Sequence, residues 1–379
     1  MYKIMTPGPV QVPEKVRMAR SRSTTNADLD PVFYDEYKAL CEKISGLLHT
    51  DNETLILSGE GILGLEAACA SLTEPGDQVL VLDNGIYGAG FADFVTMYGG
   101  EPTLYTTDYK NEIDPDELEA YLEENHDFKY ATVVHCDTPS GMLNDIHRIC
   151  PILKSFGILT VVDSVSGMFG NRVDVDAAKI DLLCGGSQKA ISAPPGLTTV
   201  TISDDVKDAM NNRKTPIASF YCNLNTFKGY YESKWFPYTM PISDIYGLEA
   251  AIDLIAEEGE GLYERHARLA NATRKALQEA GLSLYQESGF SDTVTVFEIP
   301  EGMTDVAILN RMKELHGIML AGSFGELGGK VIRIGHMGAS ANTADMLAVM
   351  SGLEETLTFL GYNMKKSLLG TFQILVNDL

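Results

Sequence analysis

The chain has 379 residues, of which 45% are hydrophobic and 22% are charged, a balance typical of globular proteins with a sizeable core. Its formal net charge of -24 repels phosphate backbones and anionic lipids, which argues against nucleic acids and membrane surfaces as partners. The length favours two domains of ~150 residues each.

Cysteine usage and the lack of long apolar runs indicate the compartment. The six cysteines are scattered without a Cys-x-x-Cys pair, which is typical of small core residues in a reducing environment. No apolar run approaches the ~18 residues of a membrane span, and the N-terminal residues lack the apolar core of a signal peptide. We therefore expect a cytoplasmic protein.

The elements follow one another in a regular order. Residues 6–10 (Thr-Pro-Gly-Pro-Val) cannot be helical through their prolines and predict an extended N-terminal arm over 1–20. A helix is predicted around 31–48, and amphipathic segments such as 114–124 and 145–156 then separate short β-rich runs. The predicted strands are 54–58, 78–82, 102–106, 130–135, 158–162, 181–185 and 197–202.

This alternation predicts an α/β fold. Strands that alternate with helices form crossover units, so we expect a mostly parallel seven-stranded sheet with helices on both faces. A short loop joins 181–185 to 197–202, which makes that pair a candidate for antiparallel pairing. Residues 21–258 are assigned to this large domain.

The remaining chain predicts a smaller α+β domain over 259–379. Residues 244–279 are helical and charged in pattern, with an interruption at Gly259 and Gly261. The elements predicted beyond them are a strand at 292–299, a helix from about Asp305, an apolar run at 317–320, a strand at 330–335 and a final helix from Thr343.

One lysine stands out in residues 181–196, Asp-Leu-Leu-Cys-Gly-Gly-Ser-Gln-Lys-Ala-Ile-Ser-Ala-Pro-Pro-Gly. Lys189 follows an apolar run and lies among small and apolar residues, without a helical neighbour to pair with. Burial lowers the pKa of a lysine, which frees its amine to form a Schiff base with an aldehyde. A surface lysine after a buried strand is the alternative.

Residues 59–64, Gly-Glu-Gly-Ile-Leu-Gly, match the G-x-G-x-x-G pattern at the start of a helix, and Asp83 ends the next strand. A nicotinamide-dependent dehydrogenase is therefore a competing hypothesis. A long segment precedes the motif, however, and no hydride-transfer site follows it. The turn in either case presents backbone N–H groups at a helix N-terminus, where anions bind.

Polar residues at other strand ends complete a candidate site. Asp163 ends a buried strand, where ligands bind in open α/β sheets, and a carboxylate there can hold a pyridine nitrogen protonated. Tyr87 can cover a flat ligand, and Arg333 alternates with apolar residues in a predicted strand and can bind a carboxylate bidentately. His135 and Cys136 point to opposite faces of their strand, so a shared metal site is not expected.

The motifs TPGP, GEGILGLEAA, DNGIYGAGF, HCDTPSG, VVDSVSG, GGSQKAISAPPGL, FPYTMPI and RIGHMG, in this order, resemble class V aminotransferases of pyridoxal-phosphate fold type I. The resemblance covers the chain to about Gly338. Within the family it points to alanine–glyoxylate and serine–pyruvate aminotransferases and, most of all, to pyridoxamine–pyruvate transaminases.

The resemblance implies a role for each site residue. Lys189 becomes the Schiff-base lysine and proton shuttle, and Asp163 the partner of the pyridine nitrogen. Tyr87 becomes the ring-stacking aromatic and Thr138 a hydrogen-bonding residue beside the ring. Arg333 becomes the group that holds the substrate carboxylate. The implied reaction moves an amino group from a small amino acid of the alanine or serine type to a 2-oxo acid of the pyruvate or glyoxylate type.

The same resemblance places Gly61, Ile62 and Gln188 around the phosphate of pyridoxal 5'-phosphate, with Thr239 reaching over from the other subunit of a homodimer. Glu60 departs from the phosphate-using pattern, because a carboxylate repels a phosphate dianion from a helix N-terminus. One hypothesis is therefore that unphosphorylated pyridoxamine and pyridoxal are substrates.

The alternative hypothesis is a conventional pyridoxal-phosphate enzyme in which Glu60 only caps its helix and turns outward. Gln188 keeps the phosphate-friendly type, and Phe324 stands where the pyridoxamine enzymes have an additional arginine. A fold-type-I lyase or desulfurase is a further alternative, although none of the six cysteines lies in an evident glycine-rich lid.

Overall fold

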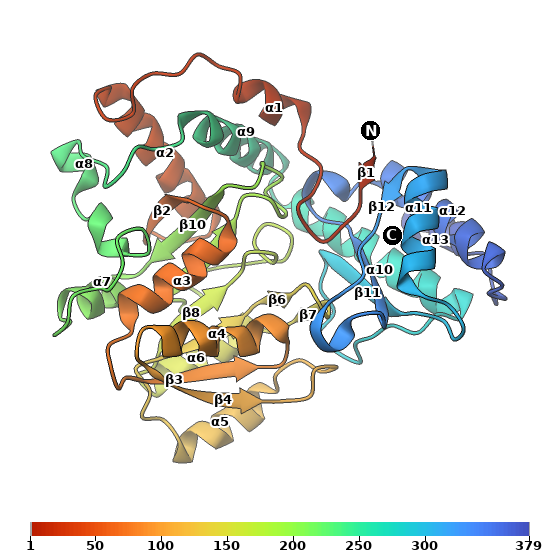
Figure 1. Ribbon diagram of the computed structural model, residues 1–379, viewed down its shortest axis with the longest axis horizontal. Coiled ribbons are helices and arrows are strands. Elements are labelled where there is room, and N and C mark those ends of the chain that lie inside the picture. The colour runs from red at the N-terminus through yellow and green to blue at the C-terminus, as the bar shows by residue number, and fades with distance from the viewer. Residues whose placement is uncertain (1, 379) are drawn as a thin grey trace.

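A seven-stranded sheet forms the centre of the computed structural model, which describes residues 2–378 (Figure 1). From one edge to the other its strands are β2 (Glu53–Ser58), β10 (Leu197–Ile202), β9 (Leu182–Gly186), β8 (Leu159–Asp163), β5 (Tyr130–Val134), β3 (Gln78–Asp83) and β4 (Glu101–Thr106). Six strands run in one direction, and only β10 runs antiparallel to its neighbours. The predicted sheet and its antiparallel pair are confirmed.

Helices cover both faces of this sheet. Every residue of β5, β9 and β10 is buried, and successive residues of a strand point to opposite faces, so neither face meets solvent there. The covering helices are α3 (Gly61–Leu72) on β9 and β10, α4 (Ile86–Met97) on β3 and β4, α6 (Ile146–Ser155) on β8, and α2 (Pro31–Leu47) on β2. The α/β fold class is therefore confirmed.

Aspartates begin two of the predicted helical segments, and a glycine ends a third. Asp114 and Asp145 accept hydrogen bonds from the first backbone N–H groups of α5 and α6, and Gly259 ends α9 at a positive φ of 58°. The other helices are α1 (Glu14–Ala19), α5 (Pro115–Glu124), α7 (Asp204–Asn211), α8 (Tyr230–Ser233), α9 (Ile242–Glu258), α10 (Gly261–Ala280), α11 (Asp305–His316), α12 (Thr343–Phe359) and α13 (Leu368–Asp378). Three short 3₁₀ helices cover Leu224–Phe227, Gly325–Leu327 and Gly338–Ser340.

The C-terminal residues build a second hydrophobic core of their own, in which α10, α11, α12 and α13 contribute most side chains. The strands of this region are β11 (Val294–Glu298), antiparallel to β13 (Val331–Gly335), and β12 (Ile318–Met319). The strands β6 (Cys136–Asp137) and β7 (Met142–Leu143) form a separate two-stranded sheet, which pairs neither with the large sheet nor with β11 and β13. The two cores support the predicted division at residue 258, which stays a prediction.

The N-terminal arm crosses between the two cores (Figure 1). Its first residues form β1 (Lys3–Ile4), which pairs in parallel with β12, and Met5 belongs to the second core. The chain then runs to α1 and α2 beside the large sheet. The sequence predicts an extended arm but not this pairing, because a two-residue strand carries no periodic pattern.

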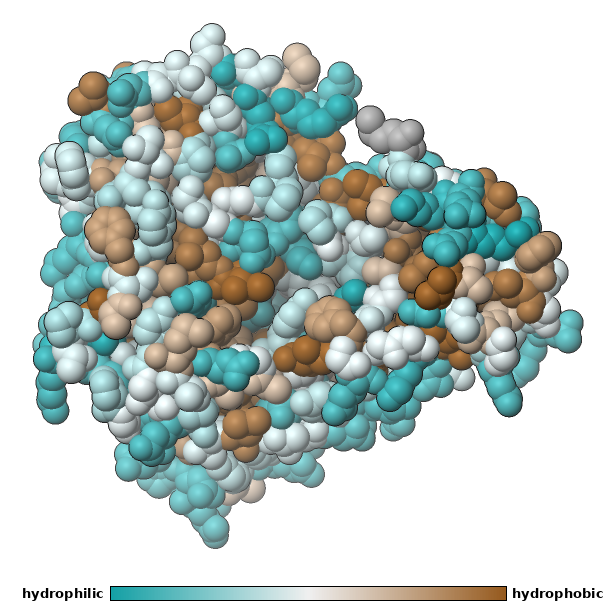
Figure 2. Space-filling view, viewed as in Figure 1, coloured by the Kyte–Doolittle hydropathy of each residue, from teal (hydrophilic) through white to brown (hydrophobic). Residues whose placement is uncertain are grey.

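The molecular surface agrees with the acidic composition. Figure 2 shows a face on which hydrophilic side chains predominate and apolar ones lie in small groups. Among residues 2–378, no helix combines the length and the apolar character needed to cross a membrane.

On the edge strand β2, a single hydroxyl group satisfies both backbone groups of Ile56. The Tyr37 hydroxyl donates to the Ile56 carbonyl (3.0 Å) and accepts from the Ile56 N–H (2.8 Å), all in a buried environment. We expect Tyr37→Phe to lower the free energy of unfolding by roughly 2–4 kcal/mol, because two buried backbone groups lose their partner. Urea denaturation followed by circular dichroism measures this change.

Tyr130→Phe is the matched control, since the equally buried Tyr130 hydroxyl contacts side chains, the Thr73 hydroxyl (2.7 Å) and the Cys69 thiol, and no backbone group. It should cost about 1 kcal/mol. Equal losses of unfolding free energy in Tyr37→Phe and Tyr130→Phe would contradict the role given to the Tyr37 hydroxyl.

Candidate functional site

A cavity of about 140 Å³ lies at the carboxyl ends of the parallel strands. Seven of the ten predicted site residues line it: Glu60, Ile62, Tyr87, Thr138, Asp163, Gln188 and Lys189. They follow β2, β3, β6, β8 and β9 in the chain, and parallel strands bring their carboxyl ends to one edge of the sheet. The topology therefore gathers residues that are up to 129 positions apart, from Glu60 to Lys189.

Lys189 is held at one side of this cavity. It follows β9 by three residues, and its Nζ donates to the Pro7 carbonyl at 2.6 Å. Burial lowers the pKa of Lys189 to about 8, and the nearby positive charge of Arg333 acts in the same direction. A sizeable fraction of the amine is therefore neutral near physiological pH, which nucleophilic attack on an aldehyde requires.

Asp163 is the last residue of β8, on the strand next to β9. Burial raises the pKa of its carboxyl group to about 7, although the Val165 N–H (2.9 Å) and the charge of Lys189 oppose this shift. The carboxylate has no hydrogen bond from a cationic side chain among the described residues. An ionised carboxylate in such a place is costly unless a cation meets it, and a protonated pyridine nitrogen is a suitable cation.

Tyr87 and Thr138 form another part of the wall. Asp137 accepts from the backbone N–H of Tyr87 (3.0 Å) and thereby fixes the first turn of α4 beside the cavity. A Cβ at Gly85 would lie 2.6 Å from the Asp137 Cγ, so this approach depends on glycine. A flat ring can lie against the Tyr87 side chain, which is about one-third exposed.

The turn before α3 has an unusual balance of hydrogen-bonding groups. Glu60 accepts from the Ile62 N–H (3.1 Å) as the N-cap of α3, and its second oxygen accepts from Nε2 of Gln188 (3.1 Å). Its carboxylate thus caps the helix and lines the cavity, and the residue is also exposed to solvent. The Oε1 atom of Gln188 is buried without a hydrogen-bond partner. At this end of the cavity both Glu60 oxygens already accept hydrogen bonds, and the Gln188 Oε1 atom lacks a donor but is shielded from solvent.

Three predicted site residues lie outside the cavity wall. Gly61 begins α3, where a Cβ would lie 2.7 Å from Cγ1 of Val165. Arg333 lies beside the cavity, with its Nε on the Gly322 carbonyl (2.6 Å) and one Nη on the Thr138 carbonyl (3.2 Å). Its remaining N–H groups are available for a carboxylate. Thr239 is exposed and donates to Asp28 (3.2 Å) of its own chain.

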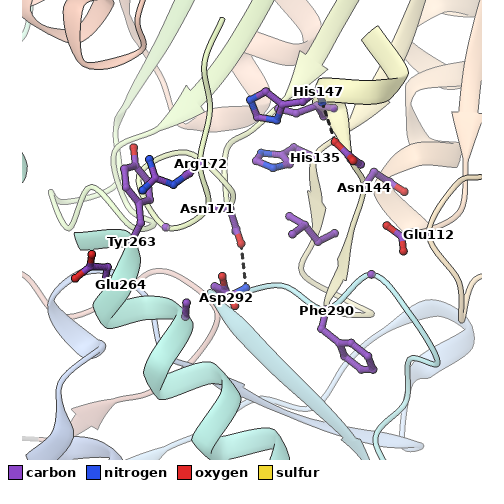
Figure 3. Close-up of a pocket in the computed structure, with 16 residues that line it drawn as sticks. Glu112, His135, Asn144, His147, Asn171, Arg172, Tyr263, Glu264, Phe290 and Asp292 are labelled. Carbon is purple, nitrogen blue, oxygen red and sulfur yellow. Dashed lines mark hydrogen bonds between the residues drawn. The ribbon is translucent and has the colours of Figure 1, made fainter. Parts of the chain in front are cut away.

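A second cavity, of about 680 Å³, is lined by His135, which directly follows β5 (Figure 3). His135 lines this second cavity and Cys136 lines the first, although the two residues do not share a strand, because His135 lies between β5 and β6. Burial lowers the pKa of His135 to about 3, and the neighbouring His147 adds to the effect. No group of three potential metal ligands occurs among the described residues.

The acid that a dinucleotide site would need is already engaged. Asp83 accepts from Thr106 (2.9 Å) and from the Tyr109 hydroxyl (2.6 Å), and it does not line the cavity. The glycine pattern of 59–64 therefore serves helix packing and the turn itself, not a ribose.

Sequence reasoning missed six lining residues: Gly8, Pro9, Leu65, Cys136, Val165 and Ser166. The motif around Gly8 was assigned only to an extended arm, although its run of Pro-Gly-Pro is a signal for a fixed path of the backbone. Cys136 was considered only as a metal ligand. Its Sγ instead donates to the Ser291 hydroxyl (3.2 Å).

Taken together, these residues fit a pyridoxal-type ring. The wall offers an amine that can bond an aldehyde, a buried acid in need of a cation, and an aromatic side chain for a ring face. The fit is less good at the phosphate position, where Glu60 already supplies a negative charge.

Comparisons with known proteins agree with this geometry. The family model "Aminotransferase class-V" matches residues 16–322. The chain is 34% identical to the pyridoxamine–pyruvate transaminase of Mesorhizobium japonicum over 92% of this chain and 90% of that protein.

Two solved structures are also similar over almost their whole length. The ureidoglycine–glyoxylate aminotransferase of Bacillus subtilis superposes with a TM-score of 0.95 at 30% identity, covering 100% of this chain and 98% of that one. The pyridoxamine–pyruvate aminotransferase of Mesorhizobium loti superposes with a TM-score of 0.94 at 31% identity, covering 99% and 97%. The chain therefore belongs to the class-V aminotransferases, pyridoxal-phosphate-dependent enzymes that transfer an amino group between an amino acid and a 2-oxo acid.

Proposed function

We propose that this aminotransferase uses unphosphorylated pyridoxamine as amino donor and a small 2-oxo acid such as pyruvate as acceptor. The products are pyridoxal and alanine, so the donor carbon exchanges its amino group for the acceptor's oxygen. The observation that carries this proposal is the pair of Glu60 and Gln188 at the N-terminus of α3.

This pair distinguishes a hydroxymethyl group from a phosphate. Glu60 fixes the orientation of the Gln188 amide, because the –NH₂ group donates to the carboxylate and the Oε1 atom is left without a donor. A phosphate dianion offers only acceptors and a negative charge, which this place opposes. A hydroxymethyl group offers one O–H donor without charge. The positive end of the helix dipole is already met by the Glu60 carboxylate.

The remaining roles follow from the chemistry of the wall. A bound pyridoxal-type ring supplies an electron sink for the carbon that loses a proton. In this proposal Lys189 Nζ removes and returns that proton, for which its lowered pKa is suited, and Asp163 binds the ring nitrogen. Tyr87 and Thr138 orient the ring. Arg333 binds the carboxylate of the oxo acid through the N–H groups that its backbone contacts leave free.

A conventional pyridoxal-phosphate-dependent alanine or serine–glyoxylate aminotransferase is the second candidate. Phe324, beside Tyr87 and Arg333, favours it, because the resemblance to pyridoxamine–pyruvate transaminases implies an arginine at that position. The chain is also 31% identical to the serine–glyoxylate aminotransferase of Arabidopsis thaliana.

We further propose a homodimer with Thr239 at the partner's site. Phe220, Tyr221 and Trp235 precede Thr239 closely in the chain and are each more than half exposed, which favours burial against another subunit. Tyr221 stacks on Tyr238 at 4.7 Å between ring centroids, which holds this aromatic segment together.

Replacing the lysine tests its role. Lys189→Ala should lower transamination by about 10²–10⁴-fold, because the base that moves the proton is lost. It should also abolish the absorbance of the Schiff base with pyridoxal. Lys275→Ala, an exposed lysine on α10, is the control and should leave both unchanged. Full activity of Lys189→Ala would refute the assignment.

Replacing Glu60 tests whether its charge makes the site prefer unphosphorylated pyridoxamine over pyridoxal phosphate. Two like charges about 4 Å apart near a protein surface repel by roughly 4 kcal/mol, so Glu60→Gln should tighten the binding of pyridoxal phosphate at least tenfold. Its kcat/KM for pyridoxamine with pyruvate should fall. Glu66→Gln, on the same helix but bonded to the Tyr98 hydroxyl outside the cavity, is the matched control. Tight phosphate binding by the unaltered protein, without pyridoxamine turnover, would favour the second candidate.

Sedimentation velocity tests the dimer. Phe220→Glu should shift the protein from dimer to monomer, because a charge cannot be buried there without a partner. Phe359→Glu introduces the same charge at an equally exposed aromatic residue of α12 and should leave the dimer intact. A monomeric unaltered protein would disprove the proposal.

A further inference from the structure

The N-terminal arm is fastened to the second core on one side. Beyond the pairing of β1 with β12, the Met5 N–H donates to the Met319 carbonyl (2.9 Å) and the Gly335 N–H donates to the Met5 carbonyl (2.7 Å). Asp345 at the start of α12 adds side-chain contacts, with an ion pair to Lys3 and a hydrogen bond from Gln11 at 2.9 Å. The arm therefore has a fixed path before and after residues 7–9.

On its other side the arm contacts the loop of residues 187–196, which joins β9 to β10 and carries Lys189. The Pro7 carbonyl accepts from Nζ of Lys189 (2.6 Å), and the Val10 N–H donates to the Gln188 carbonyl (3.1 Å). Gly8 lies directly under the lysine side chain. A Cβ at this position would overlap Cδ of Lys189 and lie 2.7 Å from its Cε and Nζ. Gly8 also has a φ of 99°, which favours glycine.

We propose that the Pro7 carbonyl and the bare backbone of Gly8 form a docking place for the free amine of Lys189. In this position the lysine is held at the cavity wall whenever it is not bonded to a ring. Pro7 and Gly8 are thus positioning residues, and they link the lysine to the second core through the arm. The proposal rests on the proposed role of Lys189 as the Schiff-base residue.

This docking place, the Pro7 carbonyl with the Gly8 backbone, has two physical effects on the Lys189 amine. A free lysine side chain samples many rotamers, and a fixed acceptor selects the rotamer that points along the wall. A carbonyl that accepts from the ammonium group also favours the charged form, and so opposes the lowering of the pKa by burial. An enzyme that takes its vitamer as a substrate has this free amine between all turnovers, which makes its position important.

Gly8→Ala tests the dock. The atoms that the new methyl group meets belong to the end of a flexible side chain, so the lysine moves away and the backbone can stay. The loss of the carbonyl then lowers the pKa of Lys189. Full-length protein freed of vitamer is mixed with pyridoxal, and the Schiff base is followed by its absorbance as a function of pH. The midpoint of the unaltered protein should lie near pH 8, and that of Gly8→Ala about one unit lower.

Gly361→Ala is a matched control. Gly361 has nearly the same φ, 95°, but a Cβ there would have no neighbour within 4 Å, so the substitution brings the same backbone strain without the contact. Its midpoint should equal that of the unaltered protein. Equal midpoints in Gly8→Ala and Gly361→Ala, with circular dichroism showing folded protein, would overturn the dock.

A second variant keeps the test decisive if Gly8→Ala does not fold. Asp345→Ala removes the side-chain contacts of the arm and leaves the cavity wall unchanged, so it should shift the midpoint in the same direction by a smaller amount. An unshifted midpoint in this variant would count against the link to the second core. If the unaltered protein forms no Schiff base at Lys189 at all, the proposed function fails instead, which separates the two outcomes.

Discussion

The burial of two ionisable groups on neighbouring strands is the constraint on which the site depends. Asp163 ends β8, Lys189 follows β9, and desolvation brings the pKa values of both toward neutrality from opposite directions, to about 7 and about 8. Each group is unstable in its charged form unless something compensates the charge. A ring with a basic nitrogen at one end and an aldehyde near the other satisfies both. The cost of burying these groups in the folded chain is thus what prepares the cavity for its ligand.

The antiparallel strand β10 makes this arrangement rigid. Because β10 returns beside β9, the loop of residues 187–196 stays at the edge of the sheet where the ligand binds. Ser187 closes the loop through its hydroxyl contact with the Pro194 carbonyl (2.6 Å), and the Ser192 N–H donates to the Lys189 carbonyl (2.9 Å). A parallel connection would carry the chain away over a helix. The lysine therefore lies on a short, internally bonded loop, which suits a residue that must keep its geometry while its bonding changes.

The sequence predicts the sheet well, because most of its strands are rich in apolar and β-branched residues and are bounded by turn residues. Strand 197–202 agrees with the structure at both ends, and the others differ by one or two residues. The residues at strand ends, such as Asp163, could be assigned because the parallel topology dictates where they meet. Contacts that depend on a backbone path without periodicity could not be predicted. The carbonyl of Pro7 and the open space at Gly8 are of this kind, and so is the unpartnered oxygen of Gln188, which results from the orientation that Glu60 imposes.

The N-terminus of α3 connects the electrostatics of the fold with the choice of ligand. A helix N-terminus after a glycine-rich turn attracts one negative charge, which either the ligand or the protein can provide. In this chain Glu60 provides it from the N-cap position and in doing so orients Gln188. The negative charge of the site is then a permanent part of the protein, and a ligand gains nothing by bringing another. In the proposed function, an uncharged group that donates a hydrogen bond completes this turn better than a dianion does, because the Glu60 carboxylate already supplies the negative charge that a phosphate would bring.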